Sequence, residues 1–214
     1  MNFFGHAAIA GHFEADPVFV LGAMLPDFCG MLGFRAPDAV PGRLGAGVRF
    51  HHVTDHAFHA RSEFQRLNRD ACADLDARGV RRGTARAVAH VGVELLLDAE
   101  LAEDDAARAR YLAALEAGHD LELFARAPFA SDDAARLERL ARALAERGVA
   151  KRPSSASVVE RLERALRARP KLAIAVEDTA RVGEWVELFR ARVVASAPTL
   201  VRELVLDIEQ RLAA

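Results

Sequence analysis

Several residue types are rare in this sequence, and each shortage excludes a class of protein. Cysteine occurs only twice in 214 residues, at Cys29 and Cys72, which is too few for a disulfide-stabilised scaffold. No uncharged apolar run approaches the ~20 residues of a membrane-spanning helix, and the first six residues lack the basic start of a secretory signal. We therefore expect a soluble chain in a reducing, cytoplasmic compartment, with no membrane span.

An excess of charge of either sign is also missing. The 29 lysines and arginines nearly balance 31 aspartates and glutamates, which leaves a formal charge of -2. Proteins that bind the phosphate backbone of nucleic acids need an excess of positive charge, so we expect no nucleic-acid partner. Hydrophobic residues make up 51% of the chain, enough for a substantial core.

Two residue types that favour β-strands are scarce, since tyrosine occurs once and threonine is infrequent. Alanine, leucine, arginine and glutamate dominate, and all of them favour helices. The sequence therefore predicts an all-α, single-domain helical bundle over residues 1–214, with a site in 1–103 and packing or lid helices in 104–214. Apolar periodicity and capping residues place the helices at 3–13, 17–25, 46–60, 62–77, 81–102, 104–117, 131–148, 157–168 and 176–212.

Proline and glycine mark where these helices should be interrupted. Pro26 is expected to end the second helix, and Pro198 to kink or divide the last one. Residues 29–45 are rich in both types and are predicted to form the longest irregular segment. Such loops are often functional, and Arg35 and Arg43 within it suit the binding of a substrate phosphate.

Histidine is unevenly distributed. Six of the eight histidines lie in the first 59 residues, and none follows His119. In the predicted helix 46–60, His51, Asp55 and His59 are four residues apart and lie on one face, at about 100° per residue. An imidazole and a carboxylate so spaced can reach one cation. A solvated polar face or a His–Asp hydrogen bond is the alternative interpretation.

The apolar stretch 87–101 carries a second set, His90, Glu94 and Asp98, with the same spacing. A carboxylate in an apolar interior costs several kcal/mol unless it is paired, protonated or bound to a metal. The alternatives are a pair between His90 and Asp55, a pair between Glu94 and an arginine, and an Asp98 that reaches solvent.

Two His-x-x-x-acid pairs on separate helices form a pattern by which helical bundles build metal sites. His6, in a short apolar helix, and Asp27 would complete a mixed nitrogen and oxygen cluster, although a buried core histidine and a turn-capping aspartate are the simpler alternatives. Such a cluster holds one or two divalent ions, which clamp a phosphoryl group and generate hydroxide near neutral pH. Manganese, iron and zinc all suit these ligands.

Four short motifs resemble those of the acyl carrier protein phosphodiesterase family. They are MNFFGH at 1–6, GAMLPDF at 22–28, AGVRFHHVTD at 46–55 and RPKL at 169–172. The resemblance implies an all-helical fold related to the HD-type metal phosphohydrolases, and removal of phosphopantetheine from a carrier protein with a divalent cation, typically manganese. By motif position, His6, Asp27, His51 and Asp55 match family residues at or near the metal.

The order of acids and histidines is also similar to the ligand series of zinc-dependent phospholipase C, read here as Asp27, His51/Asp55, His59 and His90/Glu94. This similarity concerns the pattern alone, because that enzyme is secreted and begins with a ligating tryptophan that this chain lacks.

The leading hypothesis is therefore a metal-dependent, phosphodiesterase-like hydrolase of a phosphoric ester. Its substrate would be a small phosphoester, a phospholipid-like molecule or a phosphopantetheinyl carrier protein. His52 or Asp98 would protonate the leaving group or orient a ligand. The predicted metal ligands are His6, Asp27, His51, Asp55, His59, His90 and Glu94.

Two alternatives stay open at this point. A helical binding or scaffold protein would keep the fold without turnover, and the departures from the family pattern at His52 and Leu95 favour it. In the second alternative, the two sets of histidines and acids form buried polar networks without a metal.

Overall fold

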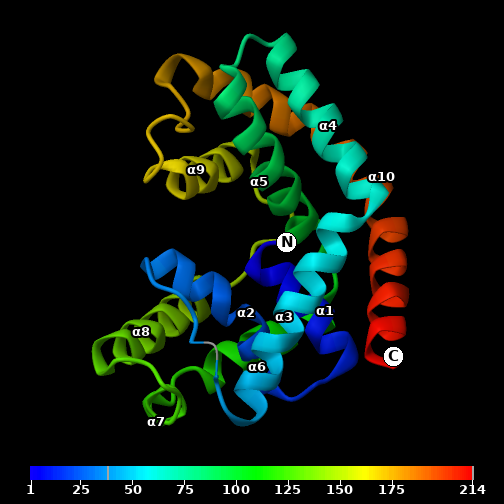
Figure 1. Ribbon diagram of the computed structural model, residues 1–214. Coiled ribbons are helices and arrows are strands. Elements are labelled where there is room, and N and C mark those ends of the chain that lie inside the picture. The colour runs from blue at the N-terminus through cyan, green and yellow to red at the C-terminus, as the bar shows by residue number, and fades with distance from the viewer. Residues whose placement is uncertain (38, 214) are drawn as a thin grey trace. The chain divides into compact units, whose positions relative to one another are not determined.

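The chain is built from helices that are joined by loops and turns (Figure 1). The computed structural model describes residues 1–37 and 39–213, and over these ranges it contains α-helices, one short 3-10 helix and no β-strand. The predicted all-α class is confirmed. The helices are α1 (Phe3–Phe13), α2 (Pro17–Leu32), α3 (Gly42–Ala60), α4 (Ser62–Ala77), α5 (Arg82–Leu101), α6 (Asp105–Ala117), α7 (Leu121–Ala125), α8 (Ser131–Arg147), α9 (Ser155–Leu166), η1 (Val176–Asp178) and α10 (Thr179–Ala213).

Contacts divide the chain into two compact units, each built from two separate stretches of sequence. The first unit comprises residues 1–57 and 101–150, with α1, α2, most of α3, α6, α7 and α8. The second unit comprises residues 58–100 and 151–214, with α4, nearly all of α5, α9 and α10. The sequence-based division at residue 103 and the single-domain architecture stay predictions.

In the first unit, α2 is the central helix and packs against α1, α6 and α8. Asp16 caps the N-terminus of α2, because its Oδ1 accepts hydrogen bonds from the backbone N–H groups of Val18 (2.8 Å) and Phe19 (3.2 Å). Pro17 occupies the first turn, where its missing N–H costs nothing. The α2 residues from Phe19 to Leu25 are all buried, so this helix supplies much of the core.

In the second unit, α5 packs its apolar face against α9 and α10. A Cβ atom added to Gly92 would lie 2.6 Å from the Trp185 ring, and its next neighbour would be Leu162 of α9. The indole of Trp185 is fully buried and stacks with Phe189 at 5.2 Å between ring centroids. Gly92 therefore creates the space into which the largest side chain of this unit fits.

Pro26 does not end the second helix and Pro198 does not divide the last one, because both prolines lie inside continuous helices; a kink at Pro198 stays a prediction. α2 continues through Pro26 to Leu32, and α10 continues through Pro198 to Ala213. The irregular segment shortens accordingly, since α2 ends at Gly33, which takes a left-handed conformation with φ of 84°. An interior proline removes one helical hydrogen bond, but α2 buries Leu25, Phe28 and Cys29 around it, and that burial outweighs the loss.

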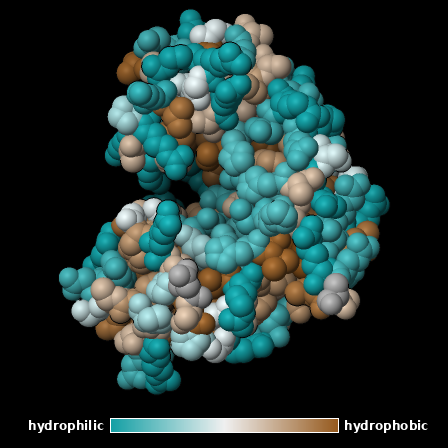
Figure 2. All heavy atoms as spheres, in the orientation of Figure 1, coloured by the Kyte–Doolittle hydropathy of each residue, from teal (hydrophilic) through white to brown (hydrophobic). Residues whose placement is uncertain are grey.

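The face shown in Figure 2 is predominantly hydrophilic, with apolar residues scattered among charged ones. None of the helices in the described ranges is long and apolar enough to cross a membrane.

Candidate metal centre

Six of the predicted ligands form two groups of three. Among the described residues, His6, Asp27 and His51 make the first ligand group, and His59, His90 and Glu94 make the second ligand group. In each group, one donor atom from every residue lies within 4.8 Å of the other two. Each group lies within one unit, the first in the first unit and the second in the second unit.

The first ligand group is assembled by a close crossing of α2 and α3. Cβ atoms added to Gly22 and Gly47 would lie 2.1 Å from the backbone oxygens of Leu44 and Phe19, so only glycine allows this approach. One turn after Gly47, the His51 ring reaches the carbonyl oxygen of Ala23, which neighbours Gly22. The crossing therefore places a histidine of α3 directly against the backbone of α2.

Hydrogen bonds fix which nitrogen of each ring carries the proton. His51 Nδ1 lies 2.8 Å from the Ala23 carbonyl oxygen, which can only accept, so His51 donates from Nδ1. His6 Nδ1 lies 3.0 Å from Thr54 Oγ1, and the Thr54 hydroxyl donates to the carbonyls of Phe50 and His51. His6 therefore donates to Thr54. In their neutral forms both rings present the Nε2 lone pair, which is the form that a metal needs.

The two rings of this group are buried and stacked, with 3.9 Å between their centroids. Burial, together with the neighbouring His6, lowers the pKa of His51 to about 3. His51 is therefore neutral at physiological pH. Asp55, one turn further along α3, borders the group, because its Oδ1 lies 3.6 Å from His6 Nε2 and 2.9 Å from the Met1 amino group.

The second ligand group forms a nearly equilateral triangle. His59 Nε2 lies 3.3 Å from His90 Nε2 and 3.3 Å from Glu94 Oε1, and His90 Nε2 lies 3.2 Å from Glu94 Oε1. The two rings are parallel within 7°. Phe64 packs edge-on against both, at 5.2 Å from His59 and 5.5 Å from His90 between ring centroids. An aromatic wall thus holds the imidazoles in this orientation.

These spacings are at the long end for hydrogen bonds and also match the distances between the ligand atoms of a metal site. N–H···O hydrogen bonds are typically about 2.9–3.0 Å long. In a tetrahedral site with bonds of about 2.0–2.1 Å, neighbouring ligand atoms are about 3.3 Å apart, as they are here. The set of two imidazoles and one carboxylate also suits zinc, iron and manganese.

Glu94 is ionised in this setting. Burial of the carboxyl raises its pKa, but hydrogen bonds from His59 and His90 act in the opposite direction, and the net pKa lies well below the ordinary value. The second ligand group therefore offers a negative charge in a mostly apolar helix.

The remaining predicted residues lie in different surroundings. Asp98 is buried, and its carboxylate lies 4.0 Å from the Arg161 guanidinium of α9. His52 and Arg35 are exposed. Arg43 forms ion pairs with Glu14 (2.6 Å) and Asp16 (3.3 Å), which ties it to the start of α2.

Sequence reasoning missed the groups that orient the ligands. Thr54 and the Ala23 carbonyl hold the rings of the first ligand group, and Phe64 packs on those of the second. The position of Thr54, three residues after His51 in the same predicted helix, was a weak signal that its hydroxyl lies near a histidine. No local pattern marks the Ala23 carbonyl or Phe64, because both act through the packing of separate helices.

Comparisons with protein-family models, curated proteins and solved structures found no match to this chain. The family resemblance, the HD-domain-like arrangement and the roles that they imply therefore stay predictions.

Proposed function

We propose that this protein is a metal-dependent hydrolase of a phosphoric ester. The observation that carries the proposal is the second ligand group, in which two imidazole nitrogens and one carboxylate oxygen are spaced as the ligands of one tetrahedral metal ion. The first ligand group would hold a second ion, since both of its rings present Nε2 and Asp27 adds a carboxylate. One or two ions of zinc, iron or manganese suit these sets.

When bound, a divalent ion in such a site lowers the pKa of water and neutralises phosphoryl charge. The chain itself supplies orientation. Thr54 and the Ala23 carbonyl hold the rings of the first ligand group, and outer hydrogen bonds of this kind tune metal affinity. Phe58 and Phe64 pack together at 4.3 Å between ring centroids beside His59, which keeps water away from one side of the second ligand group.

Proton transfer falls to residues outside the two ligand groups. His52 is exposed on α3 next to His51, with 5.3 Å between the ring centroids, and it would orient His51 or protonate a leaving group at the first ligand group. Asp98 would act as a positioning residue through Arg161, because the two are ion-paired. The substrate class is a phosphoester, either small or carried on a phosphopantetheinyl protein, and the family resemblance supports this class.

Metal removal tests the proposal. Purified protein should contain one or two equivalents of a divalent transition metal by elemental analysis. A chelator should lower both the thermal midpoint and the hydrolysis of bis(4-nitrophenyl) phosphate. An ion that binds only the folded protein stabilises it, so removal of the ion removes that stabilisation. Restoring the metal should restore both.

Variants of the second ligand group sharpen this test. Glu94→Gln and His59→Asn should each lower metal affinity and hydrolysis at least tenfold, by removal of one ligand in three. His56→Asn is the matched control, because His56 is an exposed histidine of the same helix α3, and it should behave as wild type. If the purified protein contains no metal and a chelator leaves its thermal midpoint unchanged, the proposal is refuted and a buried polar network is indicated. If metal is bound but no ester of a phosphoester panel is hydrolysed, a binding or scaffold protein is indicated.

A further inference from the structure

Two stretches of the second unit contain several cations and no acid. Residues 77–93 include four arginines, and residues 164–176 include three arginines and one lysine, yet neither stretch contains an aspartate or glutamate. The whole chain is slightly negative, so these stretches are a local concentration of positive charge.

The fold brings the two stretches together at the start of α5. Thr84 Oγ1 and Arg81 Nη2 both donate to the carbonyl oxygen of Ala173, each at 3.2 Å. A Cβ atom added to Gly83 would lie 3.5 Å from the Lys171 carbonyl oxygen. Residues 171–173 therefore lie against the first turn of α5.

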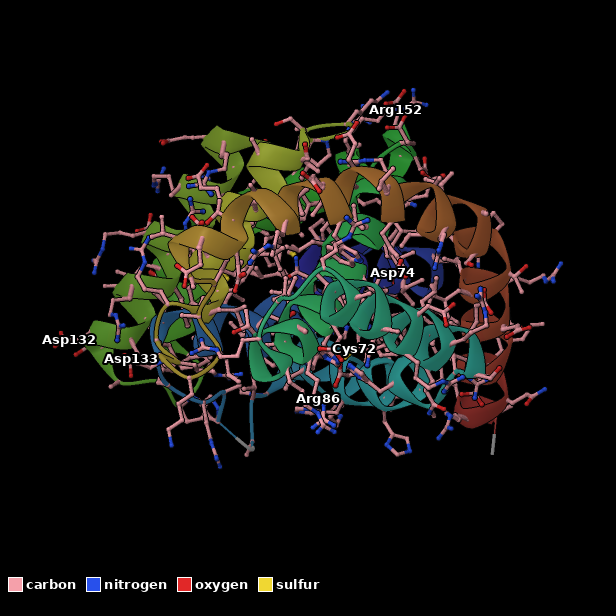
Figure 3. The ribbon with its side chains drawn as sticks, turned by 90° about the horizontal axis from the view of Figure 1, so that it is seen from above. Cys72, Asp74, Arg86, Asp132, Asp133 and Arg152 are labelled. Carbon is pink, nitrogen blue, oxygen red and sulfur yellow. The ribbon has the colours of Figure 1, made fainter. Side chains whose placement is uncertain are left out.

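Five of these cations are exposed and form no ion pair with any acid of the described residues. We call them the basic surface, namely Arg82, Arg86, Arg167, Arg169 and Lys171. Elsewhere, exposed arginines such as Arg142 and Arg211 pair with an acid four residues away on their own helix. Figure 3 shows Arg86 on α5 close to Cys72 of α4.

The basic surface is continuous with the second ligand group along α5. Arg82, Arg86, His90 and Glu94 follow one another at intervals of four residues. Side chains so spaced are neighbours on a helix, with about 5–6 Å between Cβ atoms, and each interval adds about 6 Å along the helix axis. An anion that contacts Arg86 therefore lies within one helical turn of His90.

We propose that Arg82 and Arg86 bind a phosphate group of the substrate other than the one that is hydrolysed. This inference rests on the proposed function, because it takes the second ligand group as the place of reaction. Arginine is suited to the task, since its guanidinium donates two parallel hydrogen bonds to phosphate oxygens. The substrate is accordingly a small ester with at least two phosphate groups, one at the second ligand group and one at the arginines.

Binding of inorganic pyrophosphate to chelator-treated protein tests the arginines without any metal. Isothermal titration calorimetry should detect binding at low salt that weakens as salt is added. In the double variant R82Q/R86Q the affinity should fall at least tenfold, and R82K/R86K should recover part of it. Arg202→Gln, an exposed arginine of α10, is the control and should bind as wild type.

Catalysis by metal-loaded protein supplies the second readout. R82Q/R86Q should raise KM for a 4-nitrophenyl phosphodiester that carries a further phosphate, and leave KM unchanged for the same diester without that phosphate. Circular dichroism and the thermal midpoint of the variant should match wild type, because both side chains are exposed.

The two proposals fail in different ways. Absence of pyrophosphate binding by wild type, or equal binding by wild type and R82Q/R86Q, would overturn the phosphate-binding role whatever the metal content. If R82Q/R86Q loses pyrophosphate binding but the wild-type protein never holds metal, the phosphate-binding role stands and the proposed hydrolase is refuted.

Discussion

Each buried histidine of the first ligand group has a partner that decides how it can act. Thr54 Oγ1 accepts a hydrogen bond from His6 Nδ1 and donates one to the backbone carbonyl of Phe50, while the Ala23 carbonyl accepts a hydrogen bond from His51 Nδ1. Both Nε2 atoms are thereby kept as acceptors. Under the proposed function, this arrangement would set the protonation of both rings before an ion binds, which would lower the cost of binding it.

Loss of the Thr54 hydroxyl should therefore weaken metal binding without removing a ligand. In Thr54→Val, His6 loses its Nδ1 acceptor, and we expect metal affinity to fall roughly 10–100-fold. Competition with a chromophoric chelator measures this. Thr199→Val, at an exposed position of α10, should leave the affinity unchanged, and an unchanged affinity in Thr54→Val would show that the hydroxyl plays no orienting part.

The two thiols should differ in reactivity. Cys29 is fully buried in α2, and burial together with the negative charge of Asp133 raises its pKa to about 12. Cys72 is only partly buried. In Cys72→Ser protein, the Cys29 thiol should therefore not react with Ellman's reagent at pH 8 until denaturant is added. A fast reaction in the native state would contradict the burial of Cys29.

At this scale, contacts within one helix were predictable from the sequence and contacts between helices were not. The four-residue spacing correctly placed His90 and Glu94 on one face of α5, where they lie 3.2 Å apart. It did not indicate that His59 joins them, or that Asp55 lies beside His6. Those neighbours come from different helices, so only tertiary packing determines them.

Among the helices, the contact between α2 and α3 depends most strictly on residue size. Gly22 and Gly47 let the two backbones approach until added Cβ atoms would lie 2.1 Å from backbone oxygens. Backbone atoms cannot move aside as a flexible side chain can, so a methyl group must push the helices apart.

Gly22→Ala should therefore destabilise the protein by at least about 2 kcal/mol. Gly30→Ala in the same helix is the matched control, since nothing lies within 4 Å of its added Cβ. This second change should stabilise by roughly 0.5–1 kcal/mol, through the better helix propensity of alanine. Urea denaturation followed by circular dichroism compares them, and equal midpoints would contradict the close crossing.

Helix positions were predictable from local patterns, and helix ends at prolines were not. The starts of α2 and α6 and both ends of α4 lie within one residue of the predicted positions. Pro26 was expected to end its helix and Pro198 to kink or divide its own. Both helices continue past these prolines, and Phe28 after Pro26 and Leu200 after Pro198 are buried. Local propensity carries no information about that burial, which keeps both helices continuous.

Taken as a whole, the molecule consists of two units whose sequences interleave. Residues 58–100 belong with residues 151–214, although residues 101–150 separate them in the chain. Composition predicted the all-α class, because helix formers dominate throughout. The interleaving was not predictable, since an apolar helix face shows that it will be buried but does not identify the helix that covers it.

A fragment that ends at residue 150 tests this arrangement. It retains α4 and α5 but lacks Trp185 and the rest of α10, against which α5 packs. We expect the segment 58–100 of the fragment to be cut rapidly by trypsin, while the same segment resists in the full chain. Equal resistance in the two proteins would show that α4 and α5 fold without α9 and α10.

His59 stands in the last turn of α3, since that helix ends at Ala60. Terminal turns fray more readily than helix interiors, whereas His90 and Glu94 lie in the middle of α5. Brief unwinding at one helix end would detach one of three ligands while the rest of its unit stays folded. The exchange rate of an ion held there would then follow the opening of a single turn, and a substitution that tightens this turn would slow exchange without altering the chemistry of the ligands.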